Sequence, residues 1–138
     1  MIMKTYSHQE TLKAGKDLGQ KLEHGLLCFY GDLGAGKTTF IRGLAQGLGI
    51  KTRIQSPTFT YQRVHLGRYK LYHFDCYRVE KPDELILLDI QAALESGDGV
   101  VAIEWAEHVE SFLPKNRISI HIEPQSDYSR KITFTQHD

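Results

Sequence analysis

The sequence predicts a three-layer α/β/α domain with a mixed parallel and antiparallel sheet. Segments 26–30 and 100–104 are wholly apolar until their last residue or two, which is typical of parallel strands buried on both faces by helices. Apolar residues at helical spacing lie between such segments. Alternating apolar residues at 118–122 and 132–134 favour antiparallel strands at the margin of the same sheet.

Local signals place four elements in the first part of the chain. Ser7 and Glu10 have the spacing of a capping box, the arrangement in which two side chains satisfy the first backbone N–H groups of a helix. Glycines at 47 and 49 are typical helix stops. The predicted elements are a helix over 7–23, a buried strand over 26–30, a glycine-rich loop over 31–36 and a helix over 37–48.

The remaining elements follow from turn residues and alternation. Gly67 separates two runs that read as a hairpin, and Pro82 with the acids after it is typical of a helix start. The predicted elements are a loop at Ser56-Pro57, hairpin strands over 59–65 and 70–77, a helix from 82 to 96, a strand over 100–104, and strands around 118–122 and 132–134 joined by a turn at 124–129.

Length and composition exclude several classes of protein. The residues 1–138 correspond to a single domain, which leaves no room for a separate regulatory domain. Lys plus Arg and Asp plus Glu both number 17, so no overall positive charge can hold nucleic acid by its phosphates alone. No apolar run approaches the ~20 residues of a membrane helix, and residues 1–6 do not resemble a secretory signal. We therefore expect a cytoplasmic protein with no membrane partner, and free thiols at Cys28 and Cys76.

Residues 31–38, Gly-Asp-Leu-Gly-Ala-Gly-Lys-Thr, match the Walker A pattern. Glycines let successive backbone N–H groups turn toward one anion, and the helix that follows adds its partial positive charge. Lys37 is expected to contact the β- and γ-phosphates, Thr38 to bind Mg²⁺ through its hydroxyl, and Thr39 to contact the α-phosphate. The motif predicts a P-loop NTPase-like domain.

Glu104 is the best candidate for a second group on the metal side. It ends the apolar strand 100–104, which is where the acid of a Walker B strand lies; the alternative is a strand-end carboxylate on the surface. Trp105 follows it and is the only tryptophan. Its role is either packing or forming a wall of the site.

Three polar side chains, those of His73, Asp75 and Tyr77, alternate along one predicted strand and therefore share a face. Either that face is solvated, or Asp75 points into the nucleotide site as a base or as a ligand of metal-bound water, with His73 and Tyr77 orienting it. The loop Ser56-Pro57-Thr58-Phe59 follows the Walker A helix, and its Thr58 is a candidate to reach the γ-phosphate or Mg²⁺.

These motifs together resemble the TsaE (YjeE) family of small ATPases required for threonylcarbamoyladenosine at position 37 of tRNA. The resemblance rests on the Walker A segment, Ser56–Phe59, the His-x-Asp-x-Tyr-Arg segment 73–78 and Ile103-Glu104-Trp105, and it spans nearly the whole chain. It implies a P-loop domain with a mixed sheet that binds ATP and Mg²⁺.

The resemblance also implies roles for individual residues. Phosphate binding would fall to Asp32, Leu33, Gly34, Ala35, Gly36, Lys37, Thr38 and Thr39, Mg²⁺ to Thr38 and Glu104, and catalysis to Asp75 with Lys37 and Thr58. Trp105 would lie beside the nucleotide, and Ser7 and Arg130 would frame the base. The implied partners are the threonylcarbamoyl-transferase subunit TsaD and its paralogue TsaB, so that tRNA is reached only through the complex. Slow intrinsic turnover, stimulated by the partners, is the corresponding expectation.

Other classes are distinguished by sequence features. A small GTPase would carry Asn-Lys-x-Asp for guanine, but the only asparagine is Asn116, which Arg117 follows. A small-molecule kinase would carry an Arg-rich lid, and an inactive interaction module has no need for Lys37 and Asp75. The basic and aromatic stretch 61–78 is either a solvated hairpin edge or a patch that faces tRNA or a protein partner.

Overall fold

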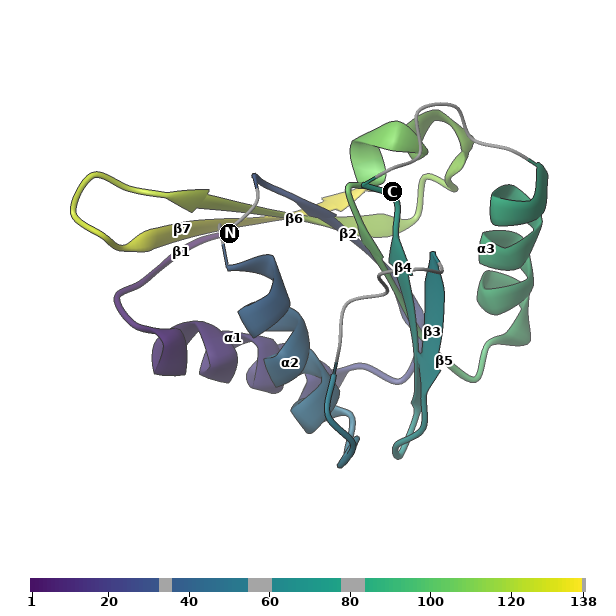
Figure 1. Cartoon of the computed structure of the whole chain (residues 1–138), viewed down its shortest axis with the longest axis horizontal. Coiled ribbons are helices and arrows are strands. Elements are labelled where there is room, and N and C mark those ends of the chain that lie inside the picture. The colour runs from purple at the N-terminus through teal and green to yellow at the C-terminus, as the bar shows by residue number, and fades with distance from the viewer. Residues whose placement is uncertain (33–35, 55–60, 78–83, 138) are drawn as a thin grey trace.

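The structure, a computed structural model, describes residues 1–32, 36–54, 61–77 and 84–137. Its elements are β1 (Ile2–Thr5), α1 (His8–Lys21), β2 (Gly25–Tyr30), α2 (Lys37–Gly47), β3 (Gln62–His65), β4 (Lys70–Asp75), α3 (Glu84–Ser96), β5 (Gly99–Glu104), the short 3₁₀ helices η1 (Ala106–His108) and η2 (Glu110–Phe112), β6 (Arg117–Pro124) and β7 (Arg130–His137). Figure 1 shows the strands as one twisted sheet with helices on both sides.

The strands form a seven-stranded sheet in the order β1-β7-β6-β2-β5-β4-β3. The strands β6, β2, β5 and β4 run parallel to one another. The outer pairs are antiparallel: β7 with β6, β1 with β7, and β3 with β4. The predicted mixed sheet is therefore confirmed. The carboxyl ends of β2, β5 and β4 lie at one edge, where open α/β sheets bind ligands.

Two apolar cores separate the three layers. One lies between the sheet and the pair α1 and α2, and contains Phe29, Phe40 and Leu44. The other lies between the sheet and α3 with η1, and contains Cys28, Phe74 and Ile103. Successive residues of each central strand point into opposite cores. Both faces of these strands are therefore buried, which is why the strands are wholly apolar.

Helices α1 and α2 pack with their backbones in contact through glycines. A Cβ added at Gly43 would lie 2.0 Å from the carbonyl oxygen of Leu12, and one added at Gly15 would lie 2.1 Å from that of Phe40. Only glycine permits such an approach. The two helices lie against each other (Figure 1), and their first turns meet where Nδ1 of His8 lies 3.3 Å from Oγ1 of Thr39.

Most predicted elements are confirmed within a few residues. Ser7 is the N-cap of α1, and its side chain accepts a hydrogen bond from the backbone N–H of Glu10. The hairpin of β3 and β4 is shorter than predicted, and residues 55–60 with the loop at Ser56-Pro57 lie outside the described residues. Both cysteines are buried free thiols.

The sheet differs from the prediction in two respects. The strand β1 was not predicted, and it pairs with β7. The alternating strands were expected at the margin of the sheet, but β6 is central because its other edge pairs parallel with β2, and β7 is covered by β1. No helix in the described ranges is long and apolar enough to cross a membrane.

Candidate functional site

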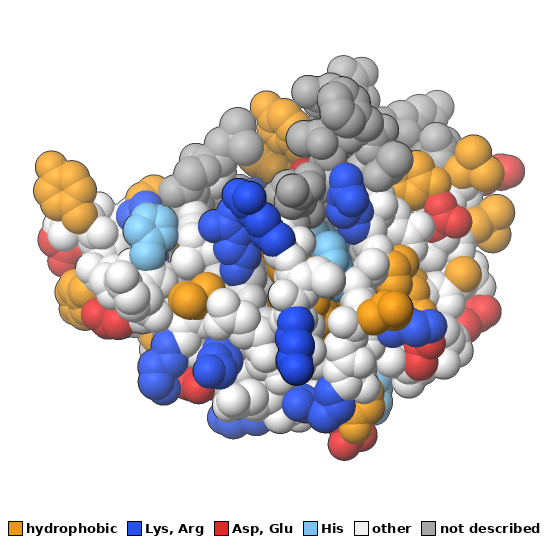
Figure 2. Space-filling view, turned by 60° about the horizontal axis from the view of Figure 1, so that its bottom comes forward, with side chains coloured by type: hydrophobic (Ala, Val, Ile, Leu, Met, Phe, Trp, Pro, Cys, Tyr) orange, Lys and Arg blue, Asp and Glu red, His pale blue; other side chains and the backbone are white. Residues whose placement is uncertain are grey.

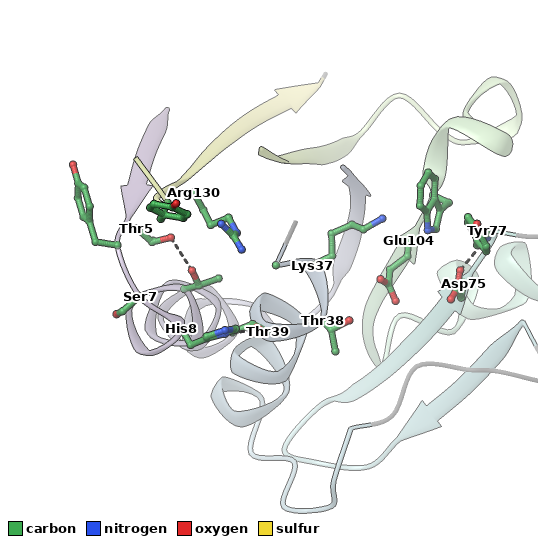
Figure 3. Close-up of a pocket in the computed structure, with 15 residues that line it drawn as sticks. Thr5, Ser7, His8, Lys37, Thr38, Thr39, Asp75, Tyr77, Glu104 and Arg130 are labelled. Atoms are coloured by element: carbon green, nitrogen blue, oxygen red, sulfur yellow. Dashed lines mark hydrogen bonds between the residues drawn. The ribbon is translucent and has the colours of Figure 1, made fainter. Parts of the chain in front are cut away.

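A cavity of about 570 Å³ opens at the carboxyl edge of the parallel strands. It runs from the start of α1 and the β6–β7 turn, across the amino terminus of α2, to the ends of β4 and β5. Figure 3 shows Lys37 near its middle, with Thr5 and Arg130 on one side and Glu104 and Asp75 on the other. The lining residues are Thr5, Tyr6, Ser7, His8, Thr11, Gly36, Lys37, Thr38, Thr39, Asp75, Tyr77, Glu104, Trp105, Tyr128 and Arg130.

Lys37 is the first residue of α2, and the residue is only 5% exposed. Its Nζ has no hydrogen-bond partner in the described part of the chain and lies 3.8 Å from the centroid of the Trp105 ring. Burial lowers the pKa of Lys37, an effect opposed by the nearby carboxylates of Glu104, Glu107 and Asp75. A buried ammonium without a hydrogen-bond acceptor is costly, so this arrangement indicates a place for an anionic ligand.

The start of α2 has the backbone of an anion site. Gly36 is its N-cap and has a φ of 111°, and within the described residues no side-chain hydrogen bond caps the helix start. The Nε of Arg130 would lie 3.6 Å from a Cβ added at Gly36, so this guanidinium is close to the loop. Unpaired N–H groups at a helix amino terminus attract anions. Thr38 and Thr39 line the cavity next to them.

Two carboxylates meet at the ends of neighbouring strands. Asp75 of β4 and Glu104 of β5 are register partners in the parallel ladder, so their side chains project from the same face of the sheet. Glu104 is 5% exposed, and its Oε2 lies 2.7 Å from Nε2 of His73, which is also buried. The prediction that His73 orients Asp75 is therefore wrong: its described partner is Glu104. A solvated face is likewise excluded for His73.

Asp75 is held by the backbone that follows it. Its Oδ1 accepts a hydrogen bond of 2.9 Å from the backbone N–H of Tyr77, so Tyr77 orients Asp75 through its main chain. Burial is the largest influence on Asp75 and raises its pKa; Glu104 raises it further, while the Tyr77 hydrogen bond, His73 and Lys37 lower it. The carboxyl group is therefore a stronger base than an exposed aspartate.

Trp105 forms a wall of the cavity. It follows β5, has a left-handed backbone (φ 57°) and lines the cavity. The ring contacts Tyr77 at 4.9 Å and His108 at 6.0 Å between centroids, and with the Lys37 contact these neighbours fix its position.

The opposite end of the cavity contains groups that sequence reasoning missed. Thr5 and Thr11 are buried and joined by a hydrogen bond of 2.7 Å between their hydroxyls. Tyr6 and Tyr128 also line this end, and Tyr128 has a positive φ of 67°. Thr5 was missed because β1 was missed, and no motif marks Tyr128.

The structure brings together most of the predicted site residues. Those that line the cavity are Ser7, Gly36, Lys37, Thr38, Thr39, Asp75, Glu104, Trp105 and Arg130. Asp32 is exposed and does not line it. Leu33, Gly34, Ala35 and Thr58 lie outside the described residues. Within the described ranges, no group of three or more His, Cys, Asp or Glu side chains is arranged to hold a metal ion.

Comparison with known proteins agrees with this architecture. Residues 5–132 match the family model described as threonylcarbamoyl adenosine biosynthesis protein TsaE. The tRNA threonylcarbamoyladenosine biosynthesis protein TsaE of Treponema pallidum is 42% identical over 92% of this chain and 94% of its own length. The Bacillus subtilis protein of the same name is 46% identical over 80% of this chain and 68% of its own length.

A solved structure supports the same assignment. The crystal structure of Bacillus subtilis YdiB superposes with a TM-score of 0.82 at 36% identity, covering 100% of this chain and 86% of the other. The three-layer P-loop NTPase-like fold predicted from the motifs is thus confirmed. Together with the matched family model, this shows that the chain belongs to the TsaE family of threonylcarbamoyl adenosine biosynthesis proteins.

Proposed function

We propose that this chain binds ATP with Mg²⁺ and hydrolyses it slowly, as an accessory protein for threonylcarbamoylation of adenosine 37 in tRNA. The observation that carries the proposal is the buried Nζ of Lys37 at the amino terminus of α2, which has no hydrogen-bond partner among the described residues and lies opposite two carboxylates. That is the charge arrangement required by a metal-bound polyphosphate. The partners proposed are the transferase subunit TsaD and its paralogue TsaB, in the cytoplasm, with tRNA contacted through the complex.

Anion binding is assigned to the start of α2. The N–H groups after Gly36 and the ammonium of Lys37 supply positive charge, and no side chain of the described residues caps these N–H groups. Moving from its position over Trp105 to a phosphate oxygen would give Lys37 a full charge-assisted hydrogen bond. Arg130 and the hydroxyl groups of Thr5, Ser7 and Thr11 are assigned to the nucleoside end, although the Ser7 side chain already caps α1.

The residues present suit a magnesium ion. Thr38 and Glu104 both line the cavity and offer oxygen atoms, the ligands that Mg²⁺ prefers, and the ion, when bound, neutralises phosphate charge. Glu104 shares its Oε2 with His73, which fixes the carboxylate in one orientation. Pairing of this kind keeps a buried acid in place before a ligand arrives.

Asp75 is assigned to the attacking water. The Tyr77 N–H occupies Oδ1, so a proton taken from water would go to Oδ2. Because burial raises the pKa of Asp75, the carboxylate accepts a proton more readily than that of an exposed aspartate.

The test separates binding from hydrolysis. Lys37→Ala is expected to remove most ATP affinity, and Asp75→Asn to retain it while stopping turnover, measured by calorimetry with Mg-ATP and by phosphate release. The control is Lys115→Ala, an exposed lysine outside the cavity. Normal ATP affinity in Lys37→Ala, or undiminished turnover in Asp75→Asn, would refute the assignment. Stronger competition by GTP than by ATP would favour a GTPase-like switch.

A further inference from the structure

A second hollow of about 550 Å³ adjoins the nucleotide cavity. It lies between the first turns of α1, the outer face of α2 and residues 50–54, and His8 and Thr39 line both hollows. A smaller hollow of about 380 Å³ continues it along α1, and shares Gln9, Leu12 and Gln46 with it. We call the two together the α1–α2 groove.

The α1–α2 groove concentrates positive charge in a chain whose formal charges cancel. Arg42, Lys51 and Arg53 line the first hollow without an acidic residue, and Lys16 lines the second. Asp17 is the acid there and pairs with Lys13 at 2.9 Å. In the described ranges, none of the other four cations forms an ion pair with a carboxylate. Figure 2 shows Lys and Arg side chains gathered over this face. Such clustering favours an anionic partner.

The floor of the groove is apolar. Ala45, Ile50 and Ile54 are buried beneath it and Leu12 is half-buried, while Gln9 and Gln46 offer amides at its sides. Phosphates gain nothing from an aliphatic floor, and single-stranded RNA is bound by aromatic side chains that stack on its bases; the part of the lining that the structure describes includes no Phe, Tyr or Trp. A peptide with Asp or Glu beside apolar side chains matches both the rim and the floor.

We propose that the α1–α2 groove binds an acidic, partly apolar segment of the protein complex on which this chain acts. The inference rests on the proposed function and adds the surface and the chemistry of recognition. Nδ1 of His8 lies 3.3 Å from Oγ1 of Thr39, which follows the two residues assigned to phosphate and metal. An occupant that shifts α1 or Thr39 therefore changes nucleotide affinity, and nucleotide changes its affinity by the same factor.

The experiment compares three forms of the full chain. The groove variant is Arg42→Gln/Lys51→Gln/Arg53→Gln. The matched control, Lys4→Gln/Lys21→Gln/Lys115→Gln, removes the same charge at exposed positions outside the groove. Binding to the purified transferase–paralogue complex is measured by biolayer interferometry with and without Mg-ADP over a salt series. Free tRNA is tested separately by filter binding.

The groove variant is expected to bind the complex at least about tenfold more weakly, mainly through a slower association rate that loses its salt dependence, with its basal ATPase unchanged. The control is expected to stay within about twofold of the wild type. Equal losses in both variants, or no loss in the groove variant, overturn the inference while leaving the proposed function standing. Loss of tRNA binding alone in the groove variant overturns it in favour of RNA. If the wild-type chain does not bind the complex, the inference and the proposed partner fail together, and basal ATPase then reports separately on the nucleotide site.

Discussion

Gly43→Ala is the most direct test of how the fold positions the site. The added Cβ would lie 2.0 Å from the Leu12 carbonyl oxygen and 2.9 Å from its carbon, against 3.4 Å or more for ordinary contact. Both atoms belong to the backbone of α1, so no side chain can rotate away. Helix α1 must instead move back by more than 1 Å, the difference between 3.4 Å and 2.0 Å.

The expected cost follows from two opposing effects. Overpacking a well-packed contact costs typically 1–3 kcal/mol, and the rigid backbone contact places this variant at about the upper value. Alanine recovers about 1 kcal/mol of helix propensity over glycine. The net loss is therefore about 2 kcal/mol in the free energy of unfolding, or roughly 6 °C in Tm for a chain of this size.

The displacement also has a consequence at the site. Moving α1 separates His8 from Thr39 and shifts the hydroxyls of Ser7 and Thr11 along the cavity, so affinity for ATP should fall more than the affinity for inorganic triphosphate. Urea denaturation followed by circular dichroism measures the first effect, and calorimetry the second. Gln20→Ala, exposed on α1, is the control and should be neutral or slightly stabilising. If Gly43→Ala were as stable as the wild type, the glycine contact would not govern helix packing.

Three further predictions concern His73, Asp75 and the two buried cysteines. His73→Ala should raise the Mg²⁺ concentration needed for half-maximal ATPase and lower the free energy of unfolding by about 1–3 kcal/mol, because Glu104 is left buried without its partner. His73→Gln should restore much of the Mg²⁺ response and of the stability. Equal behaviour of the two variants in a Mg²⁺ titration would contradict the pairing. Asp75→Asn should increase the free energy of unfolding at pH 7, because burial raises the pKa of Asp75 in the folded state and its ionised form therefore opposes folding. This gain in stability should shrink as the pH falls through the raised pKa and vanish below 3.8, the ordinary pKa of the group. Urea titrations that show the same difference between variant and wild type at pH 3 and pH 7 would refute this. Burial raises the pKa of both Cys28 and Cys76 to about 12, so the native protein should be inert to Ellman's reagent at pH 8 and release two equivalents only when unfolded, a result that one rapidly reacting thiol would exclude.

The parts of the fold that sequence predicted are those fixed by short-range physics. The cap at Ser7 and the wholly apolar strands carry their signals within a few residues. By contrast, β1 has no such signal, because its stability comes from β7, more than a hundred residues away: Met1 and Phe134 exchange backbone hydrogen bonds of 2.9 and 3.0 Å. The alternation of apolar residues predicted β6 as a strand. It could not predict that β6 pairs parallel with β2 on one edge and antiparallel with β7 on the other, because the order of strands in the sheet is set by the whole fold.

In the candidate site, too, local sequence signals predicted which residues lie at strand ends, but not which side chains contact one another. Strand ends could be predicted, and the parallel register of β4 and β5 then necessarily brings Asp75 beside Glu104. Alternation along β4 placed His73 on the face of Asp75, yet it cannot say which carboxylate the imidazole reaches. The cross-strand neighbour of His73 is Ala102, whereas the carboxylate that its ring contacts belongs to Glu104, two residues further along β5. Ala102→Val, which adds two methyl groups beside His73, should therefore weaken the His73–Glu104 pair and raise the Mg²⁺ requirement as His73→Ala does. An unchanged Mg²⁺ requirement in a folded Ala102→Val variant would show that Glu104 holds its orientation without the imidazole.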